Sequence, residues 1–319
     1  MSTMLAAILG APRRFGLLRA ALPQPAAGEV RIAVQGSGVC ASSLPLWEGR
    51  DWFEYPTSPG TPGHEGWGLV DAIGDGVTTV REGDRVAYLS TTAFAEYDIA
   101  AADGLVQLPP ALDGKPFPAE AVACAMNAFR RTEAIAGQTA AVIGIGFLGA
   151  ILVRLLSRAG MHVIALSRRP YALDLAKQCG AEETINLSDR WQAAARVWQR
   201  TGGAGCSRVI EAVGVQDTLD LATDLVGQGG RLVIAGYHQD GRRSVDMQSW
   251  NWKGIDVVNA HERDRARYVQ GMREGVAAVL DGTIPLETLL TPFPLGQIDD
   301  AFRSLEERRE PFVKAVVLT

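Results

Sequence analysis

The chain contains 319 residues, of which 47% are hydrophobic, so it can bury a large core, and its length suggests two domains rather than one. Its formal net charge is −5 at pH 7, which argues against a general nucleic-acid-binding protein. The longest apolar stretch without a charge, residues 139–153, is too short to span a lipid bilayer.

The N-terminal segment lacks the pattern of an export signal. Its apolar residues precede Arg13 and Arg14, whereas a secretory signal places its basic residues first. The four cysteines are too few and too scattered for a disulfide framework. We therefore expect a cytoplasmic protein with reduced thiols and no membrane span.

Residues 1–117 contain short strand-like segments that are separated by glycine and proline. We expect strands at 29–35, 68–73, 84–89 and 95–99. Strands at this spacing are typical of a β-barrel or sandwich, and we predict a partly open barrel.

Residues 118–264 change to an alternation of helices and strands, beginning with a helix-like segment at 120–135. We expect strands at 140–145, 163–167, 184–186, 208–212 and 230–236, with helices at 170–180 and 218–226. This alternation predicts a doubly wound parallel sheet of the Rossmann type. In residues 265–319 we expect a helix at 265–281, a short helix at 298–307 and a strand at 313–318, which returns to the first domain.

A glycine-rich turn lies at the start of the second domain. An apolar strand-like run enters Gly144-x-Gly146-x-x-Gly149, and an apolar helix-like segment follows it. In a dinucleotide site the first glycine allows the turn, the second lets backbone amides approach a pyrophosphate, and the third lets helix and strand pack closely. We predict such a site here, with an ordinary strand-to-helix turn as the alternative. Residues within the motif and at the ends of later strands are expected to line it: Phe147, Leu148, Ala212 and Gly236.

The end of the second strand of this domain indicates which dinucleotide binds. NAD sites usually have Asp or Glu at this position, whereas the 2′-phosphate of NADP is attracted by arginine. The chain has Ser167 here, followed by Arg168 and Arg169, which favours NADP over NAD. Alternatively, both arginines are solvated residues of a surface loop.

Three segments of the chain carry candidate metal ligands. They are Gly38-Val-Cys-Ala-Ser-Ser43, Pro62-Gly-His-Glu-Gly-Trp-Gly68 and Glu120-Ala-Val-Ala-Cys-Ala-Met-Asn-Ala-Phe-Arg-Arg131. With the order of elements along nearly the whole chain, these segments resemble the medium-chain dehydrogenase/reductase superfamily, in particular its zinc-dependent alcohol and sorbitol-type polyol dehydrogenases. The resemblance implies a GroES-like catalytic domain joined to a Rossmann domain, and a homodimer or homotetramer.

The resemblance also implies roles for individual residues. Cys40 and His64 would be zinc ligands, and Ser42 would hydrogen-bond the substrate oxygen. In the polyol group a glutamate replaces the third ligand cysteine of other alcohol dehydrogenases, and Glu120 stands at that position. Glu65 could replace Glu120 as a ligand or lie behind the ligands.

The residue types fit this assignment, because catalytic zinc accepts sulfur, nitrogen and oxygen donors and keeps a fourth position for water or substrate. Each residue also has a structural explanation. Cys40 could be a small buried residue, His64 a hydrogen-bonded loop histidine, and Glu120 a carboxylate at a helix start. Cys124 lies one helical turn beyond Glu120 and competes with it as the third ligand.

The chain departs from the pattern of the family in three places. The cysteine-rich structural zinc lobe is missing between residues 86 and 94, so we expect one zinc. Pro45 occupies the position at which many relatives carry a proton-relay histidine, and Ser43 replaces the usual aspartate. The proton would therefore leave through Ser42, Glu65 or water.

These observations predict a zinc-dependent oxidoreductase that transfers a hydride between an alcohol or polyol, or the matching carbonyl, and NAD(P). Two other functions stay open. One is a metal-free NADPH-dependent enone or quinone reductase of the same superfamily, and the other is a non-enzymatic NADPH-binding sensor. For the dehydrogenase and for the metal-free reductase, the partner is a small-molecule substrate, and the sequence leaves its identity open.

Overall fold

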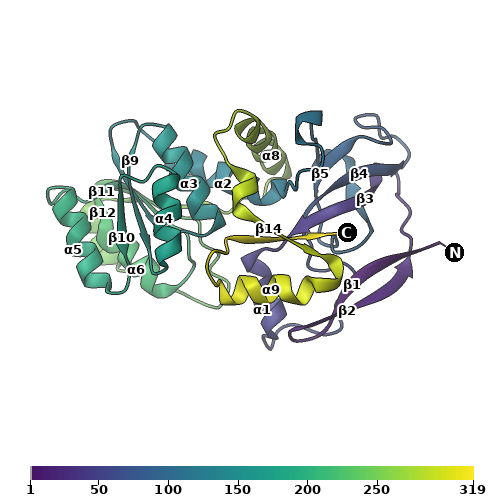
Figure 1. The fold of residues 1–319 in the computed structure, drawn as a ribbon. Coiled ribbons are helices and arrows are strands. Elements are labelled where there is room, and N and C mark those ends of the chain that lie inside the picture. The colour runs from purple at the N-terminus through teal and green to yellow at the C-terminus, as the bar shows by residue number, and fades with distance from the viewer. Residues whose placement is uncertain (1) are drawn as a thin grey trace. The chain divides into compact units, whose positions relative to one another are not determined.

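Two β-sheets divide the chain into two units in the computed structural model, which describes residues 2–319 (Figure 1). Unit 1 combines Met1–Ala123 with Asp264–Thr319, and unit 2 is Cys124–Arg263. Both ends of the chain therefore belong to the same unit. Within the described residues, no helix has the length and apolar character needed to cross a membrane.

Unit 1 is built around a seven-stranded sheet. Its strands are β3 (Glu29–Gly38), β4 (Glu65–Ile73), β5 (Arg85–Leu89), β6 (Tyr97–Ala101), β7 (Leu105–Gln107), β14 (Leu290–Pro294) and β15 (Lys314–Leu318). The order is β14-β15-β3-β4-β5-β7, and β6 pairs with β3. Because β15 pairs antiparallel with the end of β3, the last strand of the chain lies beside one of the first. A separate antiparallel pair consists of β1 (Thr3–Ala11) and β2 (Arg14–Ala21).

Three helices complete unit 1: α1 (Leu44–Glu48), α8 (Arg265–Leu280) and α9 (Ile298–Glu307). Apolar residues recur on one face of α9 at helical spacing, and that face is buried. Phe302 on this face packs against Phe15, Trp47 and Phe94, with ring centroids 5.1, 5.2 and 5.9 Å away. The C-terminal helix therefore shares a core with residues from the first third of the chain.

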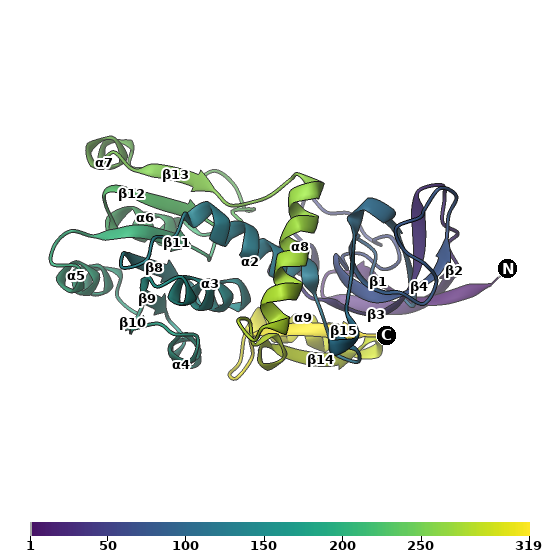
Figure 2. The same cartoon turned by 90° about the horizontal axis from the view of Figure 1, so that it is seen from above.

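Unit 2 is a six-stranded parallel sheet with helices on both faces (Figures 1 and 2). Its strands are β8 (Thr139–Ile143), β9 (His162–Ser167), β10 (Glu183–Asn186), β11 (Cys206–Glu211), β12 (Val226–Ile234) and β13 (Asp256–Asn259). Its helices are α3 (Phe147–Arg158), α4 (Pro170–Gln178), α5 (Arg190–Arg200), α6 (Gln216–Leu225) and α7 (Met247–Lys253). The central strands are nearly continuous apolar runs, as expected for strands covered on both faces.

The strand order in unit 2 is β10-β9-β8-β11-β12-β13, and every pair is parallel. The chain runs outward from β8 on one side and then returns to build the other side from β11. In sheets of this kind, ligands bind beyond the carboxyl ends of the strands where the order reverses. That point lies between β8 and β11.

The doubly wound sheet and the strand-rich first domain are both confirmed by the structure. Some boundaries differ from the expected ones: the helix expected at 120–135 is α2 (Ala119–Thr132), and the strand expected at 95–99 is β6. The pair β1 and β2 is not predicted from the sequence, because the apolar run of β1 shows no clear alternation.

Candidate active site

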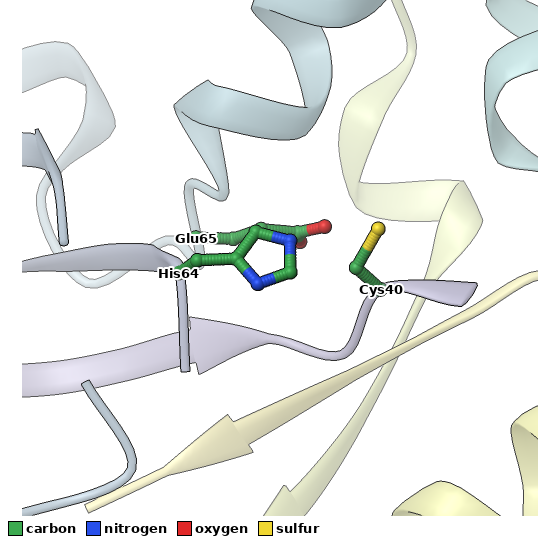
Figure 3. Close-up of side chains that lie close together, drawn as sticks. All are labelled: Cys40, His64 and Glu65. Carbon is green, nitrogen blue, oxygen red and sulfur yellow. The ribbon is translucent and has the colours of Figure 1, made fainter. Parts of the chain in front are cut away.

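Three potential metal ligands converge at the start of β4 in unit 1 (Figure 3). The ligand atoms of Cys40, His64 and Glu65 all lie within 4.8 Å of one another. Cys40 follows β3, while His64 immediately precedes β4, and the pairing of Gly38 with Glu65 brings these strand ends together. Two segments that are about 25 positions apart in the sequence thus supply one site.

The local backbone fits closely around this cluster. A Cβ atom on Gly38 would collide with Oε2 of Glu65, so only glycine leaves room for that carboxylate. The Nδ1 atom of His64 lies 3.0 Å from the carbonyl oxygen of Pro62, which can only accept a hydrogen bond. In the neutral ring Nδ1 therefore carries the proton, and Nε2 is the nitrogen that can bind a metal.

A buried lysine from the end of the chain completes the cluster. The Nζ atom of Lys314, the first residue of β15, donates to Oε1 of Glu65 at 2.8 Å and to the carbonyl oxygen of Val39 at 3.2 Å. The side chain of Glu65 is fully buried, and that of Lys314 is 5% exposed. The sequence gives no role to Lys314, although a lysine at the start of a buried apolar strand is a signal that it needs a partner.

The site is rich in negative charge. Burial lowers the pKa of His64, but its hydrogen bond to Cys40 and the charges of Cys40, Glu120 and Glu65 outweigh burial and raise the pKa to about 10. Burial likewise opposes the charge of Lys314, yet the negative groups around it raise its pKa. A site that stabilises two cations in this way is electrostatically suited to a metal cation.

Glu120 lies in the first turn of α2, close enough for its charge to act on His64. Burial raises the pKa of Glu120, and the charge of His64 opposes that rise. Its Oε1 atom accepts a hydrogen bond of 2.9 Å from the hydroxyl of Tyr268. Glu120 is not in the group whose ligand atoms lie within 4.8 Å, so its role as a third ligand stays a prediction, as does the competing role of Cys124.

The donor set fits a catalytic zinc ion. It offers one sulfur, one nitrogen and one carboxylate oxygen, which zinc accepts together. Both oxygens of the buried Glu65 carboxylate lie within 2.8 Å of Nζ of Lys314, so this carboxylate is held in its ionised, ion-paired position beside Cys40 and His64. No other group of three His, Cys, Asp or Glu ligands of this kind occurs in the part of the chain that the structure describes.

The hydroxyl of Ser42 lies next to the cluster. Its Oγ atom donates to Sγ of Cys40 at 3.2 Å, which places it at the sulfur that would bind a metal. Pro45 is buried in α1, and Ser43 is buried in the preceding turn. Neither residue supplies a histidine-like group that could relay a proton.

The glycine-rich turn in unit 2 has the geometry predicted from its sequence. Gly144 has a φ of +94°, and a Cβ atom there would collide with the side chain of Val213. A Cβ atom on Gly149 would collide with the carbonyl oxygen of Gly144, whereas one on Gly146 would meet nothing within 4 Å. Gly146 is also the N-cap of α3 and offers no capping side chain. The surface around Gly146 is therefore open to an anion at the helix start.

The two arginines after β9 occupy different environments. A terminal guanidinium nitrogen of Arg169 donates to the carbonyl oxygen of Ile145 at 3.1 Å, so this side chain supports the glycine-rich turn. Arg168 is exposed and has no hydrogen bond or ion pair to the residues that the structure describes. Ser167 is buried, and its Oγ accepts from the backbone nitrogen of Arg169 at 3.3 Å. Arg168 is thus the arginine that is available to a ligand.

A charged network that the sequence does not predict connects the ends of β11 and β12. Buried Glu211 accepts hydrogen bonds from the backbone nitrogens of Val213 and Gly214 at 2.8 and 2.9 Å. Its other oxygen lies 3.0 Å from Nε2 of His238, and Nδ1 of His238 accepts from Arg243 at 3.0 Å.

This network fixes the position of two further residues that are expected at the cofactor. Ala212 directly follows Glu211, and Gly236 approaches the Gly214 backbone so closely that a Cβ atom on it would collide. The turns after β11 and β12 are therefore held against each other at the carboxyl edge of the sheet.

Two family models match the chain: an alcohol dehydrogenase GroES-like domain over residues 26–110 and a zinc-binding dehydrogenase over residues 148–278. A quinone oxidoreductase from Pseudomonas aeruginosa PAO1 is 32% identical to it, and the alignment covers 90% of each chain. The chain belongs to the medium-chain dehydrogenase/reductase superfamily. An alcohol dehydrogenase from Moraxella sp. strain TAE123 is 28% identical over 90% of each chain.

A solved structure with the same fold is that of a protein described as a short chain alcohol dehydrogenase from Escherichia coli CFT073, in complex with the cofactor NADH. It superposes with a TM-score of 0.88 at 22% identity and covers 100% of both chains. The predicted family and fold class are thus confirmed, and the protein is an oxidoreductase of the alcohol dehydrogenase type.

Proposed function

We propose that this medium-chain dehydrogenase/reductase is a zinc-dependent enzyme that transfers a hydride between an alcohol or polyol and NADP, or in reverse from NADPH to the matching carbonyl. The observation that carries the proposal is the convergence of Cys40, His64 and Glu65, with sulfur, nitrogen and oxygen donors within 4.8 Å. A buried anionic cluster of this composition is suited to a catalytic zinc site.

Cys40 and His64 are the two ligands on which the resemblance and the geometry agree. For the third ligand, the family pattern favours Glu120, whereas the distances favour Glu65. The two possibilities are compatible with one site if one carboxylate binds the metal directly and the other acts through water. Glu120→Ala and Glu65→Ala should therefore differ in zinc content, and Cys124→Ala should leave it unchanged.

Zinc bound at this site would supply a Lewis acid that polarises the oxygen of the substrate. Ser42, whose Oγ already lies 3.2 Å from Sγ of Cys40, would hydrogen-bond that oxygen and take up or give back its proton. Pro45 has no proton to transfer, so the onward path runs through Ser42, Glu65 or water. The cofactor performs the redox step, and the protein supplies position and charge.

We propose NADP as the preferred cofactor because of the difference between the two arginines. Arg168 is exposed without a partner, beside Ser167, which carries no carboxylate that would repel a phosphate. The Escherichia coli relative contains NADH, so this preference depends on the residues of the present chain. Arg168→Ala should reduce the preference for NADP by about tenfold to a hundredfold, since hydrogen bonds to charged groups contribute about 1.5–3 kcal/mol.

Arg169→Ala is the matched control for Arg168→Ala. Its guanidinium holds the carbonyl of Ile145, so its loss should weaken binding of both cofactors rather than change the preference. Titrating each variant with NADP and NAD by fluorescence or calorimetry separates the two effects. Equal affinity of the wild-type protein for both cofactors would show that the NADP assignment is wrong.

The decisive test of the function is a substrate panel measured with both cofactors and with metal content on the same preparation. We expect about one zinc per chain and turnover of an alcohol or polyol, which chelation removes. Full turnover in chelated protein, or two zinc ions per chain, would contradict the proposal.

A metal-free quinone or enone reductase is the second candidate function. The observation that favours it is the 32% identity to a quinone oxidoreductase over 90% of the chain. The ligand cluster of Cys40, His64 and Glu65 argues against it, because a metal-free reaction does not require those residues together. Quinones and enones therefore belong in the substrate panel, and their reduction by metal-free protein would favour this second function.

A further inference from the structure

Glu120 has a partner from a distant helix within unit 1. The hydroxyl of Tyr268, in the first turn of α8, donates to Oε1 of Glu120 at 2.9 Å, although 148 positions separate the two residues. Tyr268 is half-buried, and α8 carries Val269 and Met272 into the core beside it. The Tyr268 hydroxyl therefore reaches the carboxylate from a helix whose neighbouring residues are buried in the core.

The first turn of α8 does not depend on this hydrogen bond for its position. Asp264 caps the helix by accepting from the backbone nitrogens of Ala266 and Arg267. Arg265 forms an ion pair with Asp103, with 2.7 Å between NH1 and Oδ1. The cap thus stabilises this turn from within α8, and the ion pair with Asp103 anchors it to another segment of unit 1.

A carboxylate that acts on a metal, directly or through water, must present one oxygen in a fixed direction. A glutamate has three side-chain torsions, and in the first turn of a helix nothing in its own backbone fixes the last of them. The Tyr268 hydroxyl holds one of the two oxygens of the Glu120 carboxylate. A donor to Oε1 therefore sets which way the other oxygen points.

We propose that Tyr268 is a positioning residue for the metal site: its hydroxyl fixes the carboxylate of Glu120 so that this group acts on the metal held by Cys40 and His64. The inference rests on the proposed function and extends it to a residue of α8. It also gives a role to the tyrosine at the point where the first turn of α8 meets the start of α2.

The test is Tyr268→Phe in the full-length protein, which removes the hydroxyl and keeps the ring. Cobalt(II) replaces zinc after chelation, and its visible absorption spectrum and dissociation constant are measured without substrate or cofactor. We expect a changed spectrum and about tenfold weaker binding of cobalt, because removing an outer hydrogen bond to a metal-site residue typically costs about 10–100-fold.

Two further variants separate positioning from mere helix packing. Arg265→Ala removes the other anchor of the same turn without touching Glu120, and it should leave the cobalt spectrum unchanged. In the background of Glu120→Ala, the change of Tyr268 to Phe should have no additional effect on cobalt binding, because both variants remove one coupled unit.

The inference is overturned if Tyr268→Phe has the spectrum and affinity of the wild type, if Arg265→Ala changes them equally, or if the two changes add in the double variant. A wild-type chain that binds no cobalt or zinc would refute the proposed function itself. That outcome is distinct, because it appears before any variant is compared.

Discussion

The two candidate sites of this protein are built from different parts of the chain: charged side chains in unit 1 and glycine backbone in unit 2. The metal-type site of unit 1 is made of side chains that carry charge, and Cys40, His64, Glu65 and Lys314 come from three separate segments. The cofactor edge of unit 2 is made mainly of backbone, with Gly144, Gly146 and Gly149 within six positions. One site depends on which charges meet, and the other depends on the absence of side chains.

This difference predicts different responses to mutation. In a buried charged cluster, removing one side chain leaves the opposite charge without a partner. The free energy of unfolding of the whole unit therefore decreases. In a glycine-rich turn, adding one methyl group either meets a neighbour or meets open space, so the cost depends on the position. Five experiments test this contrast, beginning with the largest expected effect.

Cys40→Ser and His64→Ala should each abolish zinc binding while leaving NADPH affinity nearly unchanged. The ligands lie in unit 1, whereas the glycine-rich turn lies in unit 2. We expect a fall from about one zinc per chain to nearly none, since a catalytic site has only three protein ligands to lose. Metal analysis and a fluorescence titration with NADPH measure both properties. A parallel loss of NADPH affinity would mean that the two sites are not independent.

Lys314→Met should destabilise the protein by about 3–5 kcal/mol in metal-free form, because it leaves the fully buried Glu65 carboxylate without its cationic partner. Urea denaturation followed by circular dichroism measures the free energy of unfolding. The control is the double variant Lys314→Met with Glu65→Gln, which removes both charges and should recover most of the loss. If the double variant is no more stable than the single one, the ion pair is not the cause.

Gly149→Ala and Gly146→Ala form a matched pair. The first places a methyl group against the backbone of Gly144 and should cost about 1–3 kcal/mol of stability, as overpacking does. The second meets no neighbour within 4 Å and should fold normally, but it blocks the approach of a pyrophosphate and should weaken cofactor binding about tenfold. Thermal denaturation and cofactor titration on both variants check the pair. A stable Gly149→Ala protein with unchanged affinity would contradict it.

Thiol labelling should distinguish the core of unit 2 from the site of unit 1. Burial raises the pKa of Cys206 to about 12, so this residue remains a thiol at pH 9. Burial also raises the pKa of Cys179, and both buried thiols should resist iodoacetamide in the folded state. Partly exposed Cys40 and Cys124 should react, and added zinc should protect Cys40. Mass spectrometry of the peptides gives the result. Rapid labelling of Cys206 in folded protein would show that this core opens easily.

The same pKa shift has a consequence for stability. Because the folded pKa of Cys206 lies above the unfolded value of about 8.5, the folded state binds the proton more tightly. Its contribution to stability is therefore fully present below about pH 8.5 and decreases as the pH rises towards 12. Cys206→Ala should show a weaker loss of stability across this alkaline range, which urea denaturation at several pH values measures.

The contrast between the sites also explains what the sequence could predict. The three glycines of the turn lie within six positions, and Arg168 follows at the end of the next strand, so a local pattern is sufficient to find them. Cys40 and His64 could be found because each lies in a short recognisable segment. Lys314 and Tyr268 could not, because their roles arise only when β15 pairs with β3 and when α8 meets the start of α2.

The third ligand shows the same limit. The resemblance to polyol dehydrogenases favours Glu120, but the pairing of β3 with β4 and the missing side chain of Gly38 bring Glu65 into the group with Cys40 and His64. The position of Glu65 beside Cys40 and His64 depends on the register of two strands and on the free space at Gly38. A short sequence motif contains neither the register nor the space.

The position of Lys314 has a consequence for how the protein is made. Its ion pair with Glu65 joins a residue from the first quarter of the chain to one that is five positions from the last residue. During synthesis the N-terminal strands leave the ribosome first, so the buried carboxylate has no cationic partner until β15 has been made. A chain without β15 would contain every candidate zinc ligand and still lack the charge that pairs with Glu65. The candidate metal site can therefore reach its folded arrangement only after β15 has joined the sheet.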